Sequence, residues 1–253
     1  MDEFIEKLND FYNKFNEDKR LNHRHGQVEY LTSMKYIHNF LKPNDKIIDI
    51  GSGAGKYAIA LKNEGYDVTA VELLKTNIGK IKNNDKDLKV ISANAKDLSM
   101  FKDEEFDIAI LFGPMYHLYS MEDKIKALNE TKRITKKYIF VTYIMNEYSV
   151  IEYAFKDNNY KNIKDKLNND YHIDDPNALF FQVRQEDMDM INNKCNLSLV
   201  KRFASDGPSD YMRSYINAMD DETFNAYLNY HYKTCERKDL LGASSHLVDI
   251  LKK

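Results

Sequence analysis

Short apolar segments alternate with segments of helical periodicity through the middle of the chain. Apolar and β-branched residues dominate KIIDI (46–50), DVTAVE (67–72), LKVIS (88–92), FDIAILF (106–112) and KYIFVTY (137–143). Between them, apolar positions recur at helical spacing over residues 54–64, 74–83 and 120–134. Strands that are apolar on both faces and alternate with helices predict a parallel sheet with helices on both sides.

Helical patterns also precede this alternating region. Residues 3–18 form an amphipathic pattern, a polar stretch follows, and a second helical pattern runs from about residue 28 to 41 and stops at Pro43. We interpret residues 1–44 as N-terminal helices that cover the site.

The alternation breaks after Tyr143. Residues 146–194 contain a long polar stretch and read as an inserted helical cap, and residues 209–236 as a helical block. LSLVKRFA (197–204) and SHLVDILK (245–252) predict two more strands. The prediction is therefore an α/β fold with a doubly wound, seven-stranded sheet, whose core comprises residues 45–145 and 195–253.

Composition places few further limits on function. The 253 residues are 43% hydrophobic, enough for one full α/β domain, and the formal net charge of −3 gives no bias towards nucleic acid or an anionic membrane. Cys195 and Cys235 are too few for a disulfide framework or a cysteine-based metal site. The first residues are charged throughout, and no apolar run approaches the roughly 20 residues that cross a bilayer. We therefore expect a soluble cytoplasmic protein.

A glycine-rich loop joins the first strand to the next helix. Gly51, Gly53 and Gly55 follow Asp49 in the spacing D-x-G-x-G-x-G. Glycine lets a ligand approach the backbone closely, and the N–H groups of the loop and of the helix start are hydrogen-bond donors. The loop predicts a cofactor with polar or anionic groups at the carboxyl end of the first strand. A nicotinamide dinucleotide is disfavoured, because Lys56 stands where the dinucleotide fingerprint requires its third glycine.

Polar groups follow the next two strands as well. Glu72 ends the second strand, and a carboxylate there can accept hydrogen bonds from two ribose hydroxyls. Asn94 and Ala95 follow the third strand, where an amide side chain beside a backbone N–H suits the edge of an adenine ring. Asn94 is equally explained as an ordinary turn residue.

In their order and spacing, the segments IIDIGSGAG, VE (71–72), ANAKDL (93–98) and FDIAILFGPMYHL (106–118) resemble the class I S-adenosylmethionine-dependent methyltransferases, of the type that acts on small molecules. The resemblance covers about residues 45–145 and implies the strand order 3-2-1-4-5-7-6, with strand 7 antiparallel. It also implies S-adenosyl-L-methionine as the cofactor. The residues that it assigns to cofactor binding are Asp49, Gly51, Ser52, Gly53, Glu72, Leu73, Asn94, Ala95, Phe112 and Gly113. Gly55 has an alternative role in packing the helix on a strand.

The catalytic candidates lie just after the fourth strand. His117 is a possible general base and Tyr116 a neighbour of the acceptor, although His117 is also explained as a structural residue that bonds nearby backbone. Other polar and aromatic candidates in this region are Tyr119, Tyr143, Met145, Asn146 and Tyr148. The polar stretch at 20–30 is interpreted as a solvated loop, because His23 and His25 lack a third ligand for a metal site. Arg20 or Arg24 there is a candidate for binding an acceptor carboxylate or phosphate.

The acceptor is predicted to be a small molecule methylated on O or N. Methyltransferases that act on exocyclic amino groups in DNA or on protein amides usually carry an Asn/Asp-Pro-Pro-aromatic motif after the fourth strand, whereas residues 113–116 are GPMY. No cysteine lies where a pyrimidine methyltransferase of the cysteine-nucleophile type needs one. An RNA methyltransferase and a cofactor-binding regulatory protein without turnover remain alternatives, although the chain has no basic domain that favours nucleic acid.

Overall fold

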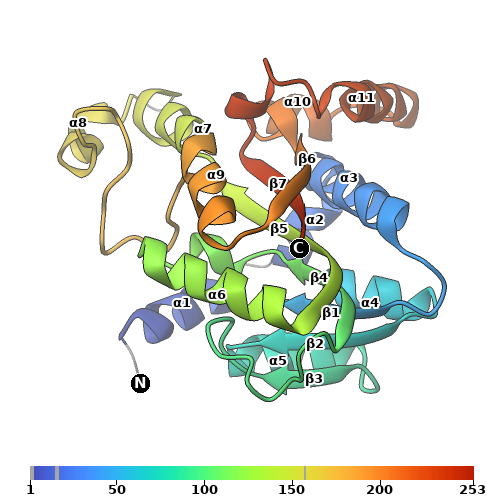
Figure 1. Ribbon diagram of the computed structural model, residues 1–253. Helices are drawn as coiled ribbons and strands as arrows, with labels where there is room; N and C mark the ends of the chain where they lie inside the picture. The colour runs from blue at the N-terminus through green and yellow to red at the C-terminus, as the bar shows by residue number, and fades with distance from the viewer. Residues whose placement is uncertain (1–2, 15–16, 157) are drawn as a thin grey trace.

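The centre of the protein is a seven-stranded sheet in the order β3-β2-β1-β4-β5-β7-β6 (Figure 1). The computed structural model describes residues 3–14, 17–156 and 158–253. The strands are β1 (Lys46–Ile50), β2 (Asp67–Glu72), β3 (Lys89–Ser92), β4 (Phe106–Leu111), β5 (Thr135–Ile144), β6 (Ser198–Ala204) and β7 (His246–Lys252). Strands β1 to β5 pair in parallel, and β7 runs antiparallel to both of its neighbours. The predicted fold and strand order are confirmed.

Strand β1 lies in the middle of the sheet, between β2 and β4. Its side chains Ile47, Ile48 and Ile50 have no exposed surface. A strand that is covered on both faces needs apolar side chains on both, which explains why this segment does not alternate with polar residues. The carboxyl end of β1, where the glycine loop begins, is thus held rigidly at the centre of the molecule.

Helices cover both faces of the sheet. Their bounds are α1 (Glu3–Lys14), α2 (Glu17–Asn22), α3 (Arg24–Phe40), α4 (Lys56–Asn63), α5 (Lys75–Asn84), α6 (Met121–Ile134), α7 (Asn146–Val150), α8 (Tyr160–Ile163), α9 (Gln185–Lys194), α10 (Arg213–Asn217) and α11 (Asp221–Thr234). Helices α6 and α9 lie in front of the sheet in Figure 1. Helix α3 packs against β6 and β5, where Tyr36 stacks on Phe203 at 3.9 Å and Phe40 meets Tyr138 edge-on.

The polar stretch at 20–30 is helical, so its interpretation as a solvated loop is wrong. Helix α2 covers its start, and α3 begins at Arg24, four residues earlier than the pattern suggested. A Cβ on Gly26 would overlap the backbone oxygen of Arg20, so the absence of a side chain lets the two helices meet closely. His25 is buried and its Nδ1 lies 3.0 Å from Oδ1 of Asn217 in α10. The polar side chain of His25, which suggested exposure to solvent, thus has a hydrogen-bond partner inside the protein. Of the predicted N-terminal helix, residues 15–16 lie outside the described residues.

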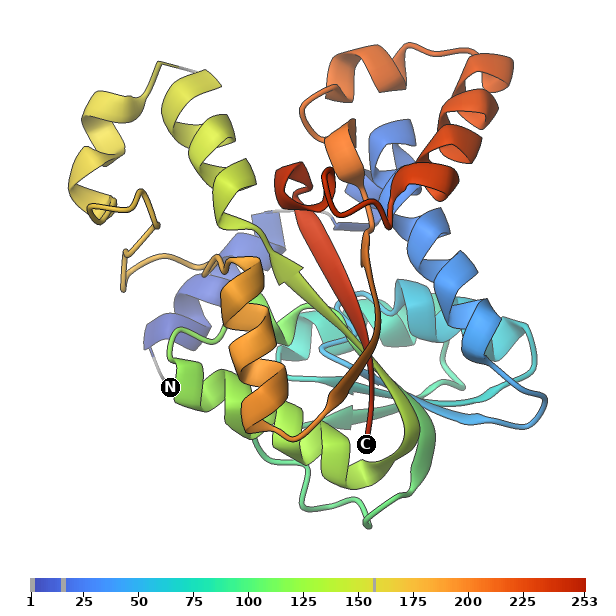
Figure 2. The ribbon, with the colours of Figure 1, turned by 45° about the horizontal axis from the view of Figure 1, so that its top comes forward.

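Two groups of helices rise beyond the carboxyl end of the sheet (Figure 2). One, shown in yellow, comprises α7, a π-helical segment at Ile151–Lys156, and α8; the other comprises α10 and α11. Helix α9 instead contacts α6 and β6. We therefore propose that the cap ends before α9 and that this helix belongs to the methyltransferase-like core. Among the described helices, none is both long enough and apolar enough to cross a membrane.

Candidate functional site

A cavity of about 1330 Å³ lies at the carboxyl end of the sheet. We call it the central cavity. All ten residues predicted to bind the cofactor line it, as do both catalytic candidates, Tyr116 and His117. Pockets for one drug-sized ligand span about 300–1,000 Å³, so the central cavity has room for two molecules side by side.

The glycine loop forms the floor of one end. The backbone N–H of Gly51 donates to the carbonyl of Val71 at 2.8 Å, which ties the loop to β2. Gly51 has φ of 73°, and a Cβ on it would lie 2.5 Å from Cδ of Pro114. A side chain is therefore excluded at this position by both conformation and space. Gly55 is the N-cap of α4, and a Cβ there would lie 3.1 Å from Ile81, which agrees with a packing role.

Asp49 presents a buried carboxylate to the central cavity. Asp49 is 1% exposed, and its Oδ2 has no hydrogen-bond partner among the described residues. Burial, followed by the negative charge of Glu72, raises the pKa of Asp49 to about 7. A buried carboxylate that lacks a counterion favours a cationic ligand, because the ligand's charge stabilises the ionised form.

Glu72 holds the glycine loop against the end of β2. Its Oε2 accepts from the N–H of Gly53 and its Oε1 from the N–H of Leu74, both at 2.8 Å. Burial raises the pKa of Glu72, although these N–H bonds act to lower it. The carboxylate therefore has a structural role besides any contact with a ribose, and this part of its role was not predicted.

The remaining cofactor candidates lie along the same wall. Oδ1 of Asn94 accepts the N–H of Lys96 at 3.0 Å, so its oxygen stabilises a turn. Ala95 is nearly buried beside it, and Phe112 meets the ring of Tyr57 edge-on at 5.2 Å. Whether Asn94 and Ala95 contact an adenine stays a prediction.

Both nitrogens of His117 have partners. Nδ1 lies 2.8 Å from the carbonyl oxygen of Leu179, and Nε2 lies 2.9 Å from the hydroxyl of Tyr12 in α1. Burial lowers the pKa of His117 to about 4, although the bond to Leu179 acts to raise it. The ring is therefore neutral at pH 7, with Nδ1 donating to Leu179 and Nε2 accepting from Tyr12.

Helix α1 lies against the central cavity and is held by polar and aromatic contacts. Phe11 meets Phe180 edge-on at 5.2 Å, and the hydroxyl of Thr76 donates to Asn9 at 2.8 Å. The ammonium of Lys80 donates to the backbone oxygen of Tyr12. Together with the Tyr12–His117 contact, these interactions make α1 one wall of the cavity.

Tyr116 links the glycine loop to the opposite side of the cavity. Its hydroxyl lies 3.7 Å from the position of a Cβ on Gly113, next to the loop. The centroid of its ring lies 6.2 Å from that of His246, the first residue of β7. The Tyr116 ring therefore lies between the predicted cofactor end and a second group of polar residues.

This second group was not predicted. Arg213 donates to Oδ1 of Asp210 at 3.1 Å and to the hydroxyl of Tyr148 at 2.9 Å, and Tyr148 donates to Oδ2 of Asp210 at 3.1 Å. All three residues line the central cavity. Of the three, only Tyr148 belongs to the predicted region after the fifth strand.

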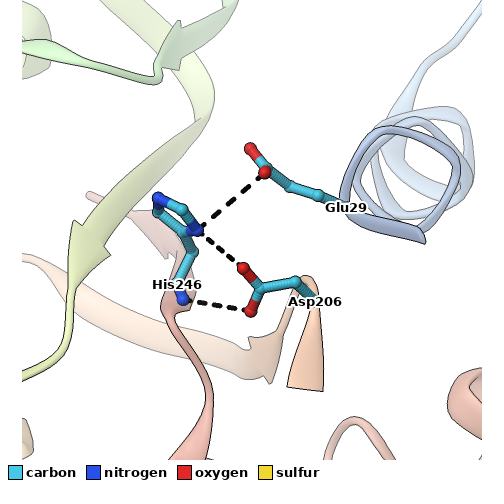
Figure 3. A group of neighbouring side chains, drawn as sticks. All are labelled: Glu29, Asp206 and His246. Atoms are coloured by element: carbon cyan, nitrogen blue, oxygen red, sulfur yellow. Dashed lines mark hydrogen bonds and ion pairs between the residues drawn. The ribbon is translucent and has the colours of Figure 1, made fainter. Parts of the chain in front are cut away.

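A cluster of Glu29, Asp206 and His246 adjoins this group (Figure 3). Nδ1 of His246 lies 2.7 Å from Oδ2 of Asp206 and 3.9 Å from Oε2 of Glu29. Glu29 is also paired with Arg20, whose Nη1 lies 2.8 Å from the same oxygen. One sequence signal pointed here: because β7 was predicted antiparallel, its first residue had to lie at the carboxyl end of β5.

Of the other candidates, Tyr119 and Arg20 line the central cavity, whereas several do not. Tyr143 is fully buried in the core, and Asn146 supports the cap by accepting from Ile173 at 2.9 Å and donating to Tyr171 at 3.0 Å. Arg24 is paired with Asp221 of α11 at 2.6 Å. Met145 and His23, like these, are not among the residues that line the central cavity.

Comparison with known proteins identifies the central part of the chain. Residues 48–140 match the family model described as "Methyltransferase domain". A ubiquinone biosynthesis O-methyltransferase of Rickettsia typhi is 28% identical over 42% of this chain and 43% of its own length. An eEF1A lysine and N-terminal methyltransferase homolog of Drosophila pseudoobscura is 25% identical over 51% of this chain. The chain spans 19% of this second relative, so neither match extends over a whole curated protein.

The fold is shared along nearly the whole chain. A crystal structure of a possible histamine N-methyltransferase from Thermotoga maritima superposes with a TM-score of 0.59. The match covers 96% of this chain and 98% of that one at 19% sequence identity. The likeness therefore extends to the N-terminal helices and the terminal strands, outside residues 48–140.

Proposed function

We propose that this chain, whose residues 48–140 match a methyltransferase domain, is a class I S-adenosylmethionine-dependent methyltransferase that methylates an oxygen or nitrogen atom of a small molecule. When bound, S-adenosylmethionine supplies an activated methyl group for in-line displacement. The chain's own residues must then hold the two molecules in line and exclude water.

The residues at the glycine loop fit this cofactor. The unpartnered Oδ2 of Asp49 suits the positive charge of the methionine portion. The backbone at Gly51 and Gly53 leaves room for close approach, since a Cβ on Gly53 would meet nothing within 4 Å. We assign Asp49 and the loop to the methionine portion, Glu72 and Leu73 to the ribose, and Asn94 and Ala95 to the adenine. Phe112 and Gly113 complete the pocket.

One observation supports acceptor methylation most strongly: the central cavity continues from the glycine loop past Tyr116 to Tyr148 and Arg213. An acceptor bound among these residues would meet the methyl group beside the Tyr116 ring. We propose that Tyr116 aligns the acceptor and that His117 holds α1 in place.

The walls of the cavity support a small acceptor. Helix α1 and residues 178–182 line it, and they meet through Phe11 against Phe180 and Phe4 against Phe181. Such a boundary leaves space for a small molecule but obstructs a folded RNA or protein. The predicted cytoplasmic location of the protein stays a prediction.

Label transfer from methyl-labelled S-adenosylmethionine tests this function. The purified protein is incubated with a cell extract, and label is counted separately in the dialysable, RNA and protein fractions. We expect label in dialysable molecules. Label in RNA alone or in protein alone would contradict the small-molecule proposal, and no transfer to any fraction would contradict turnover.

A matched pair of variants checks the site. Asp49→Asn should reduce transfer, because it removes the charge that the cofactor needs. Asp67→Asn should leave transfer unchanged, because Asp67 is exposed at the opposite end of the sheet.

A further inference from the structure

His246 is held at the acceptor end of the central cavity by both neighbouring strands. It pairs with Ile144, the last residue of β5, and its carbonyl accepts the N–H of Ser205 at 3.1 Å. Its side chain is 12% exposed and lines the cavity. The position of the ring is therefore fixed by the sheet, not by a loop.

Asp206 fixes the orientation of the ring. Oδ2 of Asp206 lies 2.7 Å from Nδ1 of His246, and Oδ1 accepts the backbone N–H of the same residue at 3.1 Å. The hydroxyl of Ser244 donates to Oδ1 as well, at 2.5 Å. Because an ionised carboxylate only accepts, Nδ1 carries a proton and the lone pair of the neutral ring is on Nε2.

Nε2 points away from the two carboxylates in Figure 3. The described residues give it no hydrogen-bond partner, in contrast to Nε2 of His117, which meets Tyr12. The Tyr116 ring lies 6.2 Å from the His246 ring, centroid to centroid, and the Tyr116 hydroxyl lies 3.7 Å from the position of a Cβ on Gly113, next to the glycine loop. A basic nitrogen therefore faces the space in which an acceptor would lie beside the methyl group.

We propose that His246, oriented by Asp206, is the base that removes a proton from the methyl acceptor. The reacting atom of the acceptor then carries a proton at neutral pH, as a hydroxyl or an ammonium group does, unlike a tertiary amine or a thioether. This inference rests on the proposed methyltransferase function and assigns a residue to one step of it.

The step balances in atoms and charge. The acceptor's proton passes to Nε2 of His246 while the acceptor's electron pair forms the bond to the methyl carbon. The electron pair of the broken carbon–sulfur bond stays on the sulfur of the leaving S-adenosylhomocysteine. The imidazolium then releases its proton to water, and Asp206 stabilises the positive ring in the meantime.

Charged groups on several elements surround this histidine: Arg20 in α2, Glu29 in α3, Asp206 after β6, and Asp210 and Arg213 near α10. His231 in α11 faces Asp206 from the other side. Burial acts to lower the pKa of His246, but Glu29 and Asp206 outweigh it and raise the pKa to about 9. The neutral, basic form of the ring therefore becomes more populated as the pH rises towards 9.

The cluster of Glu29, Asp206 and His246 does not favour a metal ion. Both oxygens of Asp206 are already used by His246 and Ser244, and the charge of Glu29 is paired with Arg20. A cation would have to displace these partners. The geometry fits a hydrogen-bonded pair better than a coordination site.

The test is the pH profile of label transfer from methyl-labelled S-adenosylmethionine to dialysable molecules of a cell extract. For the wild type we expect turnover to rise about tenfold per pH unit and to level near pH 9. His246→Gln should lower turnover by roughly 10²–10⁴-fold and flatten the profile, with cofactor affinity preserved. His38→Gln, which changes an exposed histidine of α3, is the matched control and should change neither turnover nor the pH profile.

Two further variants separate catalysis from a structural role. Glu29→Gln keeps the Asp206 contact, so it should move the profile to lower pH without abolishing turnover. Asp206→Asn should lower both the apparent pKa and the turnover, because it removes the charge and the orientation together.

The outcomes are distinct. No transfer by the wild type would overturn the proposed function, and with it this inference. Transfer that is undiminished in His246→Gln would overturn the inference alone, as would a wild-type profile that is flat from pH 6 to 9. Loss of activity with a chelator, restored by a divalent cation, would also overturn it, because the cluster would then be a metal site.

Discussion

Replacing Asp49 by Asn should stabilise the protein and weaken its binding of the cofactor. In the unfolded chain this carboxyl ionises at its ordinary pKa of 3.8, whereas burial raises its pKa to about 7 in the folded protein. Between these values the folded state holds a proton that the unfolded state has lost. The free energy of unfolding therefore falls as the pH rises from about 4 to about 7.

The size of the effect follows from the same two values. One pKa unit corresponds to about 1.4 kcal/mol, so the cost of ionising Asp49 approaches about 4 kcal/mol above pH 7 as an upper limit. Between pH 5 and pH 8 the wild type should lose about 2–3 kcal/mol relative to Asp49→Asn. For a chain of this size, that is a difference of about 5–10 °C in melting temperature.

Cofactor binding should respond in the opposite direction. A cationic cofactor stabilises ionised Asp49, so wild-type affinity should fall by up to about tenfold per pH unit below 7. Asp49→Asn should remove this dependence and lose at least about tenfold in affinity at pH 8, the value of one charge-assisted hydrogen bond.

The assay combines thermal unfolding at pH 5 and pH 8 with calorimetric titration of S-adenosylmethionine at both. Asp67→Asn, which changes an exposed carboxylate, is the control and should behave as the wild type. Parallel pH dependence of unfolding in the wild type and Asp49→Asn would show that burial does not raise the pKa of Asp49. Equal affinity for the cofactor at pH 8 would show that the charge of Asp49 does not contribute to cofactor binding.

Three other substitutions test separate parts of the site. Glu72→Ala leaves the N–H groups of Gly53 and Leu74 without their acceptor. Calorimetry should show at least about tenfold weaker cofactor binding, and thermal unfolding should show a lower melting temperature. If neither affinity nor melting temperature changes, the carboxylate neither binds the cofactor nor supports the glycine loop. His117→Gln should increase hydrogen exchange in α1 while cofactor affinity is preserved. A large loss of turnover, with the α1 amides still protected from exchange, would instead support His117 as the base. Arg213→Met should raise the KM for the acceptor, because it breaks the contact with Asp210, and an unchanged KM would exclude this residue from the acceptor site.

The sheet was predicted well because its signal is local. The bounds of β1 and β2 agree with the apolar runs at 46–50 and 67–72, since a strand buried on both faces must be apolar at nearly every position. The glycine loop could be predicted for a related reason. Its spacing and its place after β1 are both visible in the sequence.

The acceptor side was harder to predict because it is built from distant segments. Glu29, Asp206 and His246 come from three elements, and no spacing along the chain connects them. Tyr143 shows the opposite error: it is the last residue of the expected strand at 137–143, but its side chain is fully buried in the core. Position next to a strand end is thus a weaker predictor of function than which face of the sheet a side chain occupies.

The most direct test of the central claim is calorimetric titration of the wild type with S-adenosylhomocysteine and, separately, with NAD. We expect saturable binding of S-adenosylhomocysteine at one site per chain and no binding of NAD at the same concentration, because Lys56 replaces the third glycine of the dinucleotide fingerprint. Preference for NAD, or no heat with S-adenosylhomocysteine, would contradict the assignment of the glycine loop, Asp49 and Glu72 to this cofactor.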